Sequence, residues 1–397
     1  MREDEAVSNR ARTGRLRTLW WSVLLLAGAA SAADSGAGPA APARLLTENV
    51  VLIVPDGVRW QEVFTGAEKA LLNEREGGSW LDEKTLLQRF WRDDVAERRK
   101  LLFPFLWGTI AQHGQIFGNK TAGSSARVTN PYAFSYPGYN ELITGFGDPR
   151  IDSNEYGPNP NVNVFEWLNT QPDLRGRVAV HATWGAFHDI FNQPRSGLRV
   201  TAGPRLMTGP LTPRGEWLNE LIATTTMLDA DDLYNSFTQM ALVDDVQRAA
   251  PRVLFVGYGE TDSWSHSGRY DLVLTAAHQV DRFIEQLWNT MQSMPQYRGK
   301  TTFIITTDHG RGSGPVDWKE HGTPESPGSE DIWIAVIGPD TPALGERRNV
   351  PAVTQAQVAA TIAALLGRDY NSVAPKAGPP LADAIAPTAT RRSAMAR

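Results

Sequence analysis

The 397-residue sequence contains no cysteine. This absence excludes disulfide frameworks, cysteine-ligated zinc, iron–sulfur clusters and thiol nucleophiles. A strong charge of one sign is also missing, because 39 Lys and Arg against 44 Asp and Glu leave a formal net charge of −5. No long basic block is present, which argues against a surface that binds nucleic acid through its phosphates. The composition, 41% hydrophobic and 21% charged, is typical of a globular protein.

The N-terminal apolar run, residues 19–30, is about a dozen residues long, whereas a membrane-spanning helix needs about 20. Arg10, Arg12, Arg15 and Arg17 precede this run, and it ends in the small residues Ala30-Ser31-Ala32. This pattern predicts a secretory signal peptide over residues 1–32, with an uncleaved anchor as the alternative. We therefore expect an exported protein, periplasmic or secreted, without a stable membrane span after cleavage.

Continuous apolar runs separated by helical patterns predict an α/β fold. Such runs are expected of strands that are covered on both faces, and they lie at 49–55, 177–181, 252–256, 302–306 and 332–337. Apolar residues recur at helical spacing over 270–291 and over 355–366, where Gly367 ends the pattern. The alternation predicts a mostly parallel central sheet with helices on both faces.

We place this domain at residues 48–381, after a flexible Ala/Gly/Pro-rich lead-in at 33–47 and before a loose C-terminal tail at 382–397. Two segments read as helical insertions, about 65–103 and 186–250, with helices expected over 80–99 and 229–249. Either insertion could cap a site at the carboxyl ends of the strands, where ligands bind in such folds.

Carboxylates and histidines follow the predicted strands. Asp56 comes directly after the first strand, Asp308-His309 after a later one, and Asp262 precedes His266 by one helical turn. His321 follows in a polar loop, so three of the seven histidines lie in such segments. We expect His113 and His181 to be structural, His188 to lie in a loop and His278 on a helix surface. A mixed nitrogen and oxygen ligand set fits zinc best, before manganese or iron.

The segment Ala133-Phe-Ser-Tyr-Pro-Gly-Tyr139 contains a candidate nucleophile, Ser135. It lacks the Gly-x-Ser-x-Gly pattern of a triad hydrolase, and a coordinated metal ion can activate a serine in place of a histidine base. Taken alone, Ser135 is better interpreted as a turn residue than as a nucleophile.

Together, these segments resemble the alkaline phosphatase superfamily in motif and in order. The similarity is greatest to its nucleotide pyrophosphatase/phosphodiesterase branch, whose Asp-Gly-Phe-Arg resembles Asp56-Gly-Val-Arg59. That branch's Thr-Phe-Pro-Asn-His…Thr-Gly resembles Ser135-Tyr-Pro-Gly-Tyr…Thr144-Gly145. The resemblance extends from about Asn49 to Leu381 and implies an alkaline phosphatase-like fold.

The resemblance also implies a site with two divalent ions, zinc first, that hydrolyses a phosphate monoester or diester through a phosphoserine. One ion would be held by Asp262, His266 and His321. The second would be held by Asp56, Asp308 and His309, with Ser135 as a further ligand and as the nucleophile.

Substrate contacts are less clearly marked in the sequence. The branch places an asparagine after its nucleophile, where the amide donates to a phosphoryl oxygen, and Asn154 is the nearest counterpart. Arg59, Lys120 and Arg311 are candidate positive contacts to the substrate. For each of them, a solvated surface charge is the simpler interpretation.

Alternatives remain at this point. A sulfatase would need an arginine that Ser135-Tyr-Pro-Gly-Tyr139 lacks, and a phosphoglycerate mutase-like enzyme conflicts with the predicted signal peptide. A non-catalytic exported binding protein could use the same scaffold. The sequence predicts a small phosphorylated ligand as partner and leaves the oligomeric state open.

Overall fold

The computed structural model describes residues 44–208, 210–227 and 231–386, all within the compact unit that begins at Ala43. The predicted signal peptide lies outside these residues. None of the helices in the described part combines the length and the apolar character that crossing a membrane requires.

The described residues form an eight-stranded central sheet with the order β10-β2-β9-β7-β1-β6-β4-β5. Neighbouring strands pair in parallel, except that β9 runs antiparallel to β2 and β7. The predicted mostly parallel sheet is therefore confirmed. The strands are β1 (Asn49–Pro55), β2 (Gln115–Phe117), β4 (Val178–Ala182), β5 (Arg199–Ala202), β6 (Val253–Tyr258), β7 (Thr301–Thr306), β9 (Ile334–Ile337) and β10 (Gly345–Glu346).

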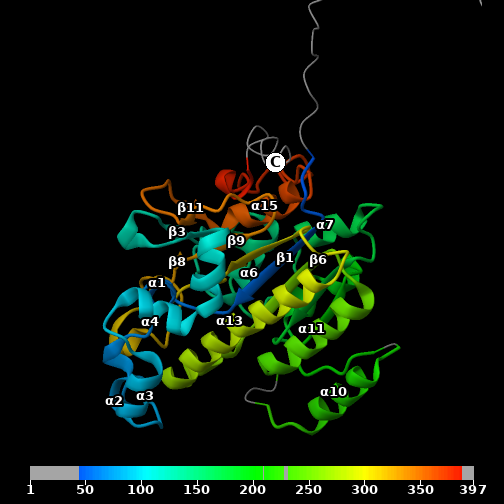
Figure 1. Ribbon diagram of the computed structural model, residues 1–397. Helices are drawn as coiled ribbons and strands as arrows, with labels where there is room; N and C mark the ends of the chain where they lie inside the picture. Colours follow the sequence, from blue (N-terminus) through cyan, green and yellow to red (C-terminus); the bar gives the residue numbers. More distant parts are fainter. Residues whose placement is uncertain (1–43, 209, 228–230, 387–397) are drawn as a thin grey trace, which may run out of the picture. The chain divides into compact units, whose positions relative to one another are not determined.

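Helices cover both faces of this sheet, and the alternation along β1 shows the two apolar layers. Val50, Leu52 and Val54 pack into one core cluster, whereas Val51 and Ile53 pack into the other. The first layer includes residues of α6 (Ser135–Thr144), α7 (Val164–Thr170) and α15 (Val358–Leu365). The second includes residues of α4 (Val95–Leu102), α11 (Asn235–Ala249) and the long α13 (Tyr270–Ser293), which runs nearly in the direction of β1 in Figure 1.

A small second sheet and several short helices complete the described part. The small sheet has the order β11-β3-β8, formed by Val353–Thr354, Ala126–Arg127 and Asp331–Ile332. The remaining helices are α1 (Trp60–Thr65), η1 (Lys69–Leu71), α2 (Glu74–Gly77), α3 (Glu83–Phe90), η2 (Leu106–Ile110), α5 (Ala111–His113), η3 (Lys120–Ala122), α8 (Phe187–Ile190), α9 (Gln193–Ser196), α10 (Pro213–Thr224), α12 (Glu260–His266), α14 (Gly314–Asp317), η4 (Gln355–Gln357) and η5 (Ala382–Ala384).

Three expected elements differ from the structure. The helix expected over 80–99 is two helices, because the side chain of Asp94 caps a new one by accepting from Glu97 N at 2.8 Å. The strand expected over 332–337 is split at Trp333 between the two sheets. In the helix expected over 229–249, residues 229 and 230 lie outside the described part and α11 begins at Asn235.

Residue Asp340 ties both ends of the described chain to the domain. Its Oδ2 accepts from Thr47 N at 2.7 Å and from Thr47 Oγ1 at 2.8 Å, and its backbone oxygen accepts from Ala386 N at 2.7 Å. The packed domain therefore includes Thr47, predicted as flexible lead-in, and Ala386, predicted as loose tail. The segment predicted as the second insertion also contributes β5 to the edge of the main sheet.

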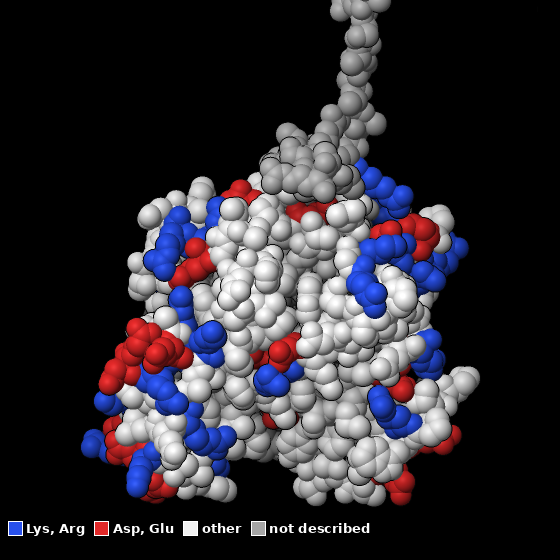
Figure 2. All heavy atoms as spheres, in the orientation of Figure 1, with Lys and Arg blue, Asp and Glu red and all other residues white. Residues whose placement is uncertain are grey.

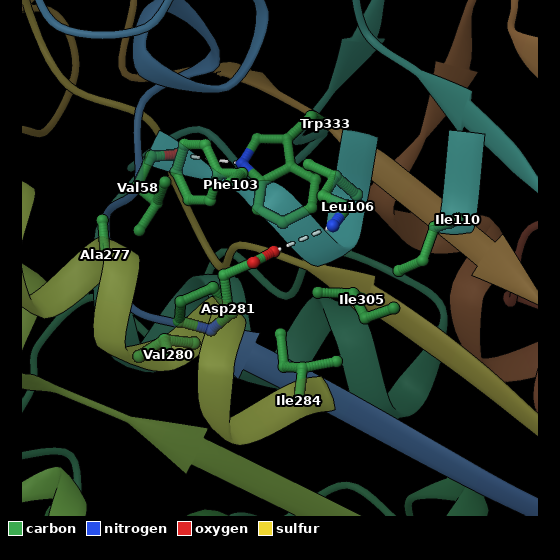
Figure 3. A pocket seen from close by; sticks show the side chains of 11 residues that line it. Val58, Phe103, Leu106, Ile110, Ala277, Val280, Asp281, Ile284, Ile305 and Trp333 are labelled. Carbon is green, nitrogen blue, oxygen red and sulfur yellow. Dashed lines mark hydrogen bonds between the residues drawn. The ribbon is translucent and has the colours of Figure 1, made fainter. Parts of the chain in front are cut away.

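An apolar cavity of about 20 Å³ lies beneath the end of β1, between α13 and η2 (Figure 3). Asp281 of α13 accepts from the backbone N–H groups of Phe105 at 2.7 Å and Leu106 at 2.9 Å, so it caps the start of η2. Across the cavity, Trp333 Nε1 donates to Val58 O at 3.1 Å. The contact from Trp333 holds the turn that follows β1.

Acidic and basic side chains lie in mixed groups on the face drawn in Figure 2, mainly toward its margins. On that face, the described residues form no broad patch of a single sign.

Candidate active site

The candidate residues meet at the carboxyl ends of three adjacent parallel strands. β1 lies between β6 and β7, and Pro55 is in register with Tyr258. The chain therefore brings Asp56 after β1, α12 after β6 and Asp308-His309 after β7 to one edge of the sheet. A cavity of about 220 Å³ opens there, lined by Asp56, Ser135, Tyr139, Asn154, Thr183, Trp184, Phe187, Asp232, Gly259, Asp262, Ser263, His266 and His321.

Ser135 is the first residue of α6 and is only 6% exposed. The turn before it contains Ala133 at a φ of 50°, a conformation that non-glycine residues rarely adopt. Asn130 Oδ1 accepts from Ala133 N at 2.8 Å, and Asn130 Nδ2 donates to Glu141 Oε2 of α6 at 2.9 Å. The helix thus holds the turn that presents Ser135 to the cavity.

Asp56, Asp308 and Ser135 surround one nitrogen of His309. His309 Nε2 lies 3.3 Å from Asp56 Oδ1, 3.4 Å from Asp308 Oδ2 and 3.4 Å from Ser135 Oγ. The ring is held by its other nitrogen, since Nδ1 lies 2.8 Å from Gly310 O. The remaining oxygen of each carboxylate accepts a hydrogen bond, Asp56 Oδ2 from Tyr139 OH at 2.8 Å and Asp308 Oδ1 from Gly57 N at 3.1 Å.

Asp262, His266 and His321 form the neighbouring group. Asp262 Oδ2 lies 3.4 Å from His266 Nε2, and Asp262 Oδ1 lies 3.6 Å from His321 Nε2. The two histidine Nε2 atoms lie 2.9 Å apart. His309 Nε2, 4.0 Å from Asp262 Oδ1, adjoins both groups.

The histidine pKa values reflect these surroundings. Burial by itself would lower the pKa of His309, but the charges of Asp308 and Asp56 outweigh it and raise that pKa to about 9. Burial lowers the pKa of His321 and of His266, so both rings are neutral at neutral pH and offer a lone pair. Burial, together with the charge of Asp56, raises the pKa of Asp308.

Two sets of donor atoms fit metal ions. Asp56, Asp308 and His309 form one set and Asp262, His309 and His321 the other, and within each set the ligand atoms lie within 4.8 Å of one another. Asp56 Oδ1 and Asp308 Oδ2 are buried and accept no hydrogen bond. Buried carboxylate oxygens are costly unless compensated, and a divalent cation supplies that compensation.

Asn154 lies beside Ser135, as expected from its place in the sequence. Its Oδ1 accepts from Tyr136 N at 2.9 Å at the start of α6, and the side chain lines the cavity. The amide nitrogen of Asn154 remains the group that can donate to a bound oxyanion.

The three candidate positive contacts do not line this cavity. Arg59 is buried and its guanidinium pairs with Glu62 and, at 3.1 Å, with Glu68. Lys120 pairs with Asp331 next to the small sheet. Arg311 is 1% exposed and pairs with Asp262. The predicted substrate contacts of Arg59 and Lys120 are therefore corrected: acidic partners hold both side chains elsewhere.

The cavity wall contains residues that the sequence did not single out, namely Thr183, Trp184, Phe187 and Asp232. Thr183 directly follows β4, so the rule that ligands bind at strand ends could have found it. Asp232 had no comparable signal, because it reaches the cavity through the pairing of Trp184 with Asp232.

The other histidines lie away from the cavity. His181 Nε2 is 3.2 Å from Asp245 Oδ2, and His188 Nδ1 is 2.6 Å from Gln193 Oε1. His278, expected on a helix surface, is half-buried, with Nδ1 2.9 Å from Leu102 O of α4. His113, expected to be structural, is exposed at the end of α5, so it contributes no buried side chain to the core.

Comparison with known proteins shows which family the chain matches. Residues 77–326 match the family model described as type I phosphodiesterase / nucleotide pyrophosphatase. The chain belongs to this family. The matched range includes Ser135 and every candidate metal ligand except Asp56.

Individual relatives are distant. Two curated proteins of Leptospira interrogans, each named a probable 2,3-bisphosphoglycerate-independent phosphoglycerate mutase, are 22% identical over 286 residues, which is 65% of this chain. The match covers 50% of each relative, so the chain spans about half of their length. Wild-type alkaline phosphatase PafA matches with a TM-score of 0.55 and 11% identity over 86% of this chain and 99% of that one. A protein of the alkaline phosphatase superfamily from Vibrio parahaemolyticus matches with a TM-score of 0.47 and 11% identity over 81% of this chain and 67% of that one.

The match to PafA shows that the fold is alkaline phosphatase-like. The family itself is given by the match of residues 77–326.

Proposed function

We propose that this protein binds two divalent cations, zinc before other metals, and hydrolyses phosphoesters through a phosphoserine on Ser135. The observation that carries the proposal is the position of Ser135 Oγ, 3.4 Å from His309 Nε2, among carboxylate oxygens that accept no hydrogen bond. Asp56, Asp308 and His309 would hold one cation. Asp262, His266 and His321 would hold the other.

Charge supports the presence of cations during catalysis. The described residues that line the cavity include Asp56, Asp232 and Asp262 and no lysine or arginine. Such a cavity would repel a phosphate group by itself. Divalent cations in the two ligand sets would reverse the local field, activate the serine oxygen and stabilise negative charge on phosphorus.

The residues of the chain then have defined roles. Ser135 loses its proton, its Oγ bonds to phosphorus, and the bond to the leaving oxygen breaks, so that oxygen takes up a proton. Water attacks phosphorus in the second step and releases Ser135, which regains a proton. The amide of Asn154, fixed through Tyr136 N, donates to a phosphoryl oxygen in both steps.

The cavity wall favours a diester over a monoester. A monoester carries an additional negative charge, and the described wall provides no cationic side chain to meet it. Trp184 and Phe187 instead offer aromatic surface to a second substituent on phosphorus. We therefore propose that a diester is the preferred substrate.

Replacement of the nucleophile tests the mechanism. In the Ser135→Ala variant we expect turnover to be lost while zinc content stays near that of the wild type, because the aspartates and histidines provide most of the ligands. Substantial turnover by this variant would show that Ser135 is not the nucleophile.

The substrate class is tested by comparing kcat/KM for an aryl phosphate diester and an aryl phosphate monoester on one zinc-loaded preparation. We expect the diester to be favoured. A monoester preference would contradict the inferred role of the cavity wall, and turnover of neither would favour the non-catalytic binding protein. Release of inorganic phosphate from a monoester would distinguish hydrolysis from a mutase reaction, which returns the phosphoryl group to an alcohol.

We also propose export to the periplasm or the medium, supported by the signal-like pattern of residues 1–32. N-terminal sequencing of the protein from a fractionated bacterial host should begin at Ala33. Recovery of the uncleaved chain only in the cytosol would contradict export.

A further inference from the structure

Arg311 carries a buried charge directly behind the candidate metal ligands. It lies three residues after Asp308, is 1% exposed and does not line the catalytic cavity. A buried guanidinium is costly unless it is paired and hydrogen-bonded. Its partners therefore indicate what the residue does.

The guanidinium of Arg311 joins two segments that carry ligands. One end pairs with Asp262 Oδ1, and the same Nη2 atom donates to the backbone oxygen of Asp262 at 3.4 Å. The other end donates from Nη1 to Lys319 O, two residues before His321. The side chain thus links α12, which bears Asp262, to the loop that bears His321.

The turn at Asp56 packs against the same side chain. Gly57 has a φ of +61°, and a Cβ built there would lie 2.9 Å from Arg311 Nε and 3.1 Å from Asp262 Oδ1. The same Cβ would lie 3.2 Å from His309 Cε1. Glycine therefore allows the segment after β1 to approach Arg311 and the ligands closely.

We propose that Arg311 is a positioning residue of the metal site: it fixes the Asp262 carboxylate and the His321 loop so that their ligand atoms converge on one cation. This inference rests on the proposed function. Asp262 Oδ1 forms an ion pair with Arg311 but accepts no hydrogen bond, so it can still bind a cation. The positive charge of Arg311 also offsets part of the negative charge of the three ligand aspartates.

The alternative roles for Arg311 make different predictions. A substrate contact would raise KM and would not respond to added zinc. A purely structural residue would lower the melting temperature without changing metal affinity. Arg98 provides the matched control, because it too is buried but donates to backbone oxygens such as Thr65 O and Arg92 O, far from the ligands in sequence.

The test measures zinc affinity by competition with a chromophoric chelator on the full chain, for the wild type, Arg311→Lys, Arg311→Met and Arg98→Met. We expect both Arg311 variants to bind one of the two zinc ions about 10- to 100-fold more weakly, the effect usual for groups that orient metal ligands. Arg98→Met should bind both ions as the wild type does, even if its melting temperature falls. The lysine variant keeps the charge and provides the measurement if the methionine variant does not fold.

Two further measurements distinguish failure of the positioning role of Arg311 from failure of the proposed function. The cobalt-substituted Arg311→Lys protein should show an altered visible absorption spectrum, and excess zinc should restore its kcat with KM unchanged. Wild-type zinc affinity in a folded Arg311 variant would overturn the positioning role. Absence of tight zinc binding in the wild type would instead overturn the proposed function.

Discussion

The protein contains two buried groups of histidine and aspartate that differ in how their charges are balanced. At β4, His181 Nε2 lies 3.2 Å from Asp245, which also pairs with Arg199 at 2.7 Å and Arg248 at 3.2 Å. One carboxylate is thus met by several cationic partners. At the strand ends, Asp56 and Asp308 together face His309, and each keeps a buried oxygen that accepts no hydrogen bond.

This difference distinguishes a structural cluster from the proposed metal-binding one. Burial by itself would raise the pKa of Asp245, but His181 and Arg199 outweigh it and lower that pKa below its usual range. Burial and neighbouring Asp56 raise the pKa of Asp308 instead. A protein tolerates such an excess of buried negative charge where a function requires it, and bound cations would relieve it.

The largest expected effect comes from replacing a proposed metal ligand in the group formed by Asp56, Asp308 and His309. Asp308→Asn keeps the shape and an acceptor for Gly57 N but loses the charge. We expect kcat/KM toward the preferred aryl phosphate to fall about 1,000-fold, the several kcal/mol that a catalytic metal ion supplies. Asp245→Asn is the control and should keep kcat/KM near the wild-type value. A loss of less than tenfold in Asp308→Asn would count against the metal site.

A smaller effect is expected at the phosphoryl contact. Asn154→Ala removes the amide donor, and Asn154→Asp removes it while keeping an acceptor for Tyr136 N. Both variants should lose about 100-fold in kcat with zinc content unchanged, as on removal of an oxyanion donor. Full activity of the aspartate variant would show that Asn154 acts only by holding the start of α6.

The cluster around Asp245 should contribute to the stability of the folded protein. Asp245→Asn breaks its charge pairs with Arg199 and Arg248 and with His181, so the free energy of unfolding should fall by about 2 kcal/mol. Urea denaturation followed by circular dichroism measures this change. Unchanged stability would mean that desolvation already offsets the pairing energy.

The smallest expected effect concerns Asp281 in the core. Burial raises the pKa of Asp281 to about 7, so the folded protein holds a proton that the unfolded chain releases near pH 4. Its contribution to stability is present below that pH and is lost as the pH rises toward 7. Asp281→Asn does not titrate, so the unfolding free energy of the wild type minus that of the variant should decrease by about 1 kcal/mol or more over this range. A difference that stays constant with pH would contradict the raised pKa.

The sequence predicts the parts of this structure that depend on local pattern. The apolar run at 49–55 coincides with β1, and the strand ends bring Asp56 and Asp308 together because adjacent parallel strands end at one edge. The short edge strand β5 was not predicted, because its four residues, of which only Ala202 is buried, form no continuous apolar run. The interruption of the strand at Trp333 was not predicted either, because tertiary packing determines where the chain passes from one sheet to the other.

Contacts between distant segments account for what the sequence missed at the site. Arg59 has a local partner, because Glu62 lies three residues later on the same helical turn. Arg311 pairs with Asp262, which is 49 residues away, and only the fold shows that contact.

The most direct test of the two-cation site is the metal content of the full chain after equilibrium dialysis against zinc. We expect about two tightly bound zinc ions per chain, as in two-metal hydrolases, and the same content in Ser135→Ala. A folded protein that retains no zinc would contradict the two-cation site.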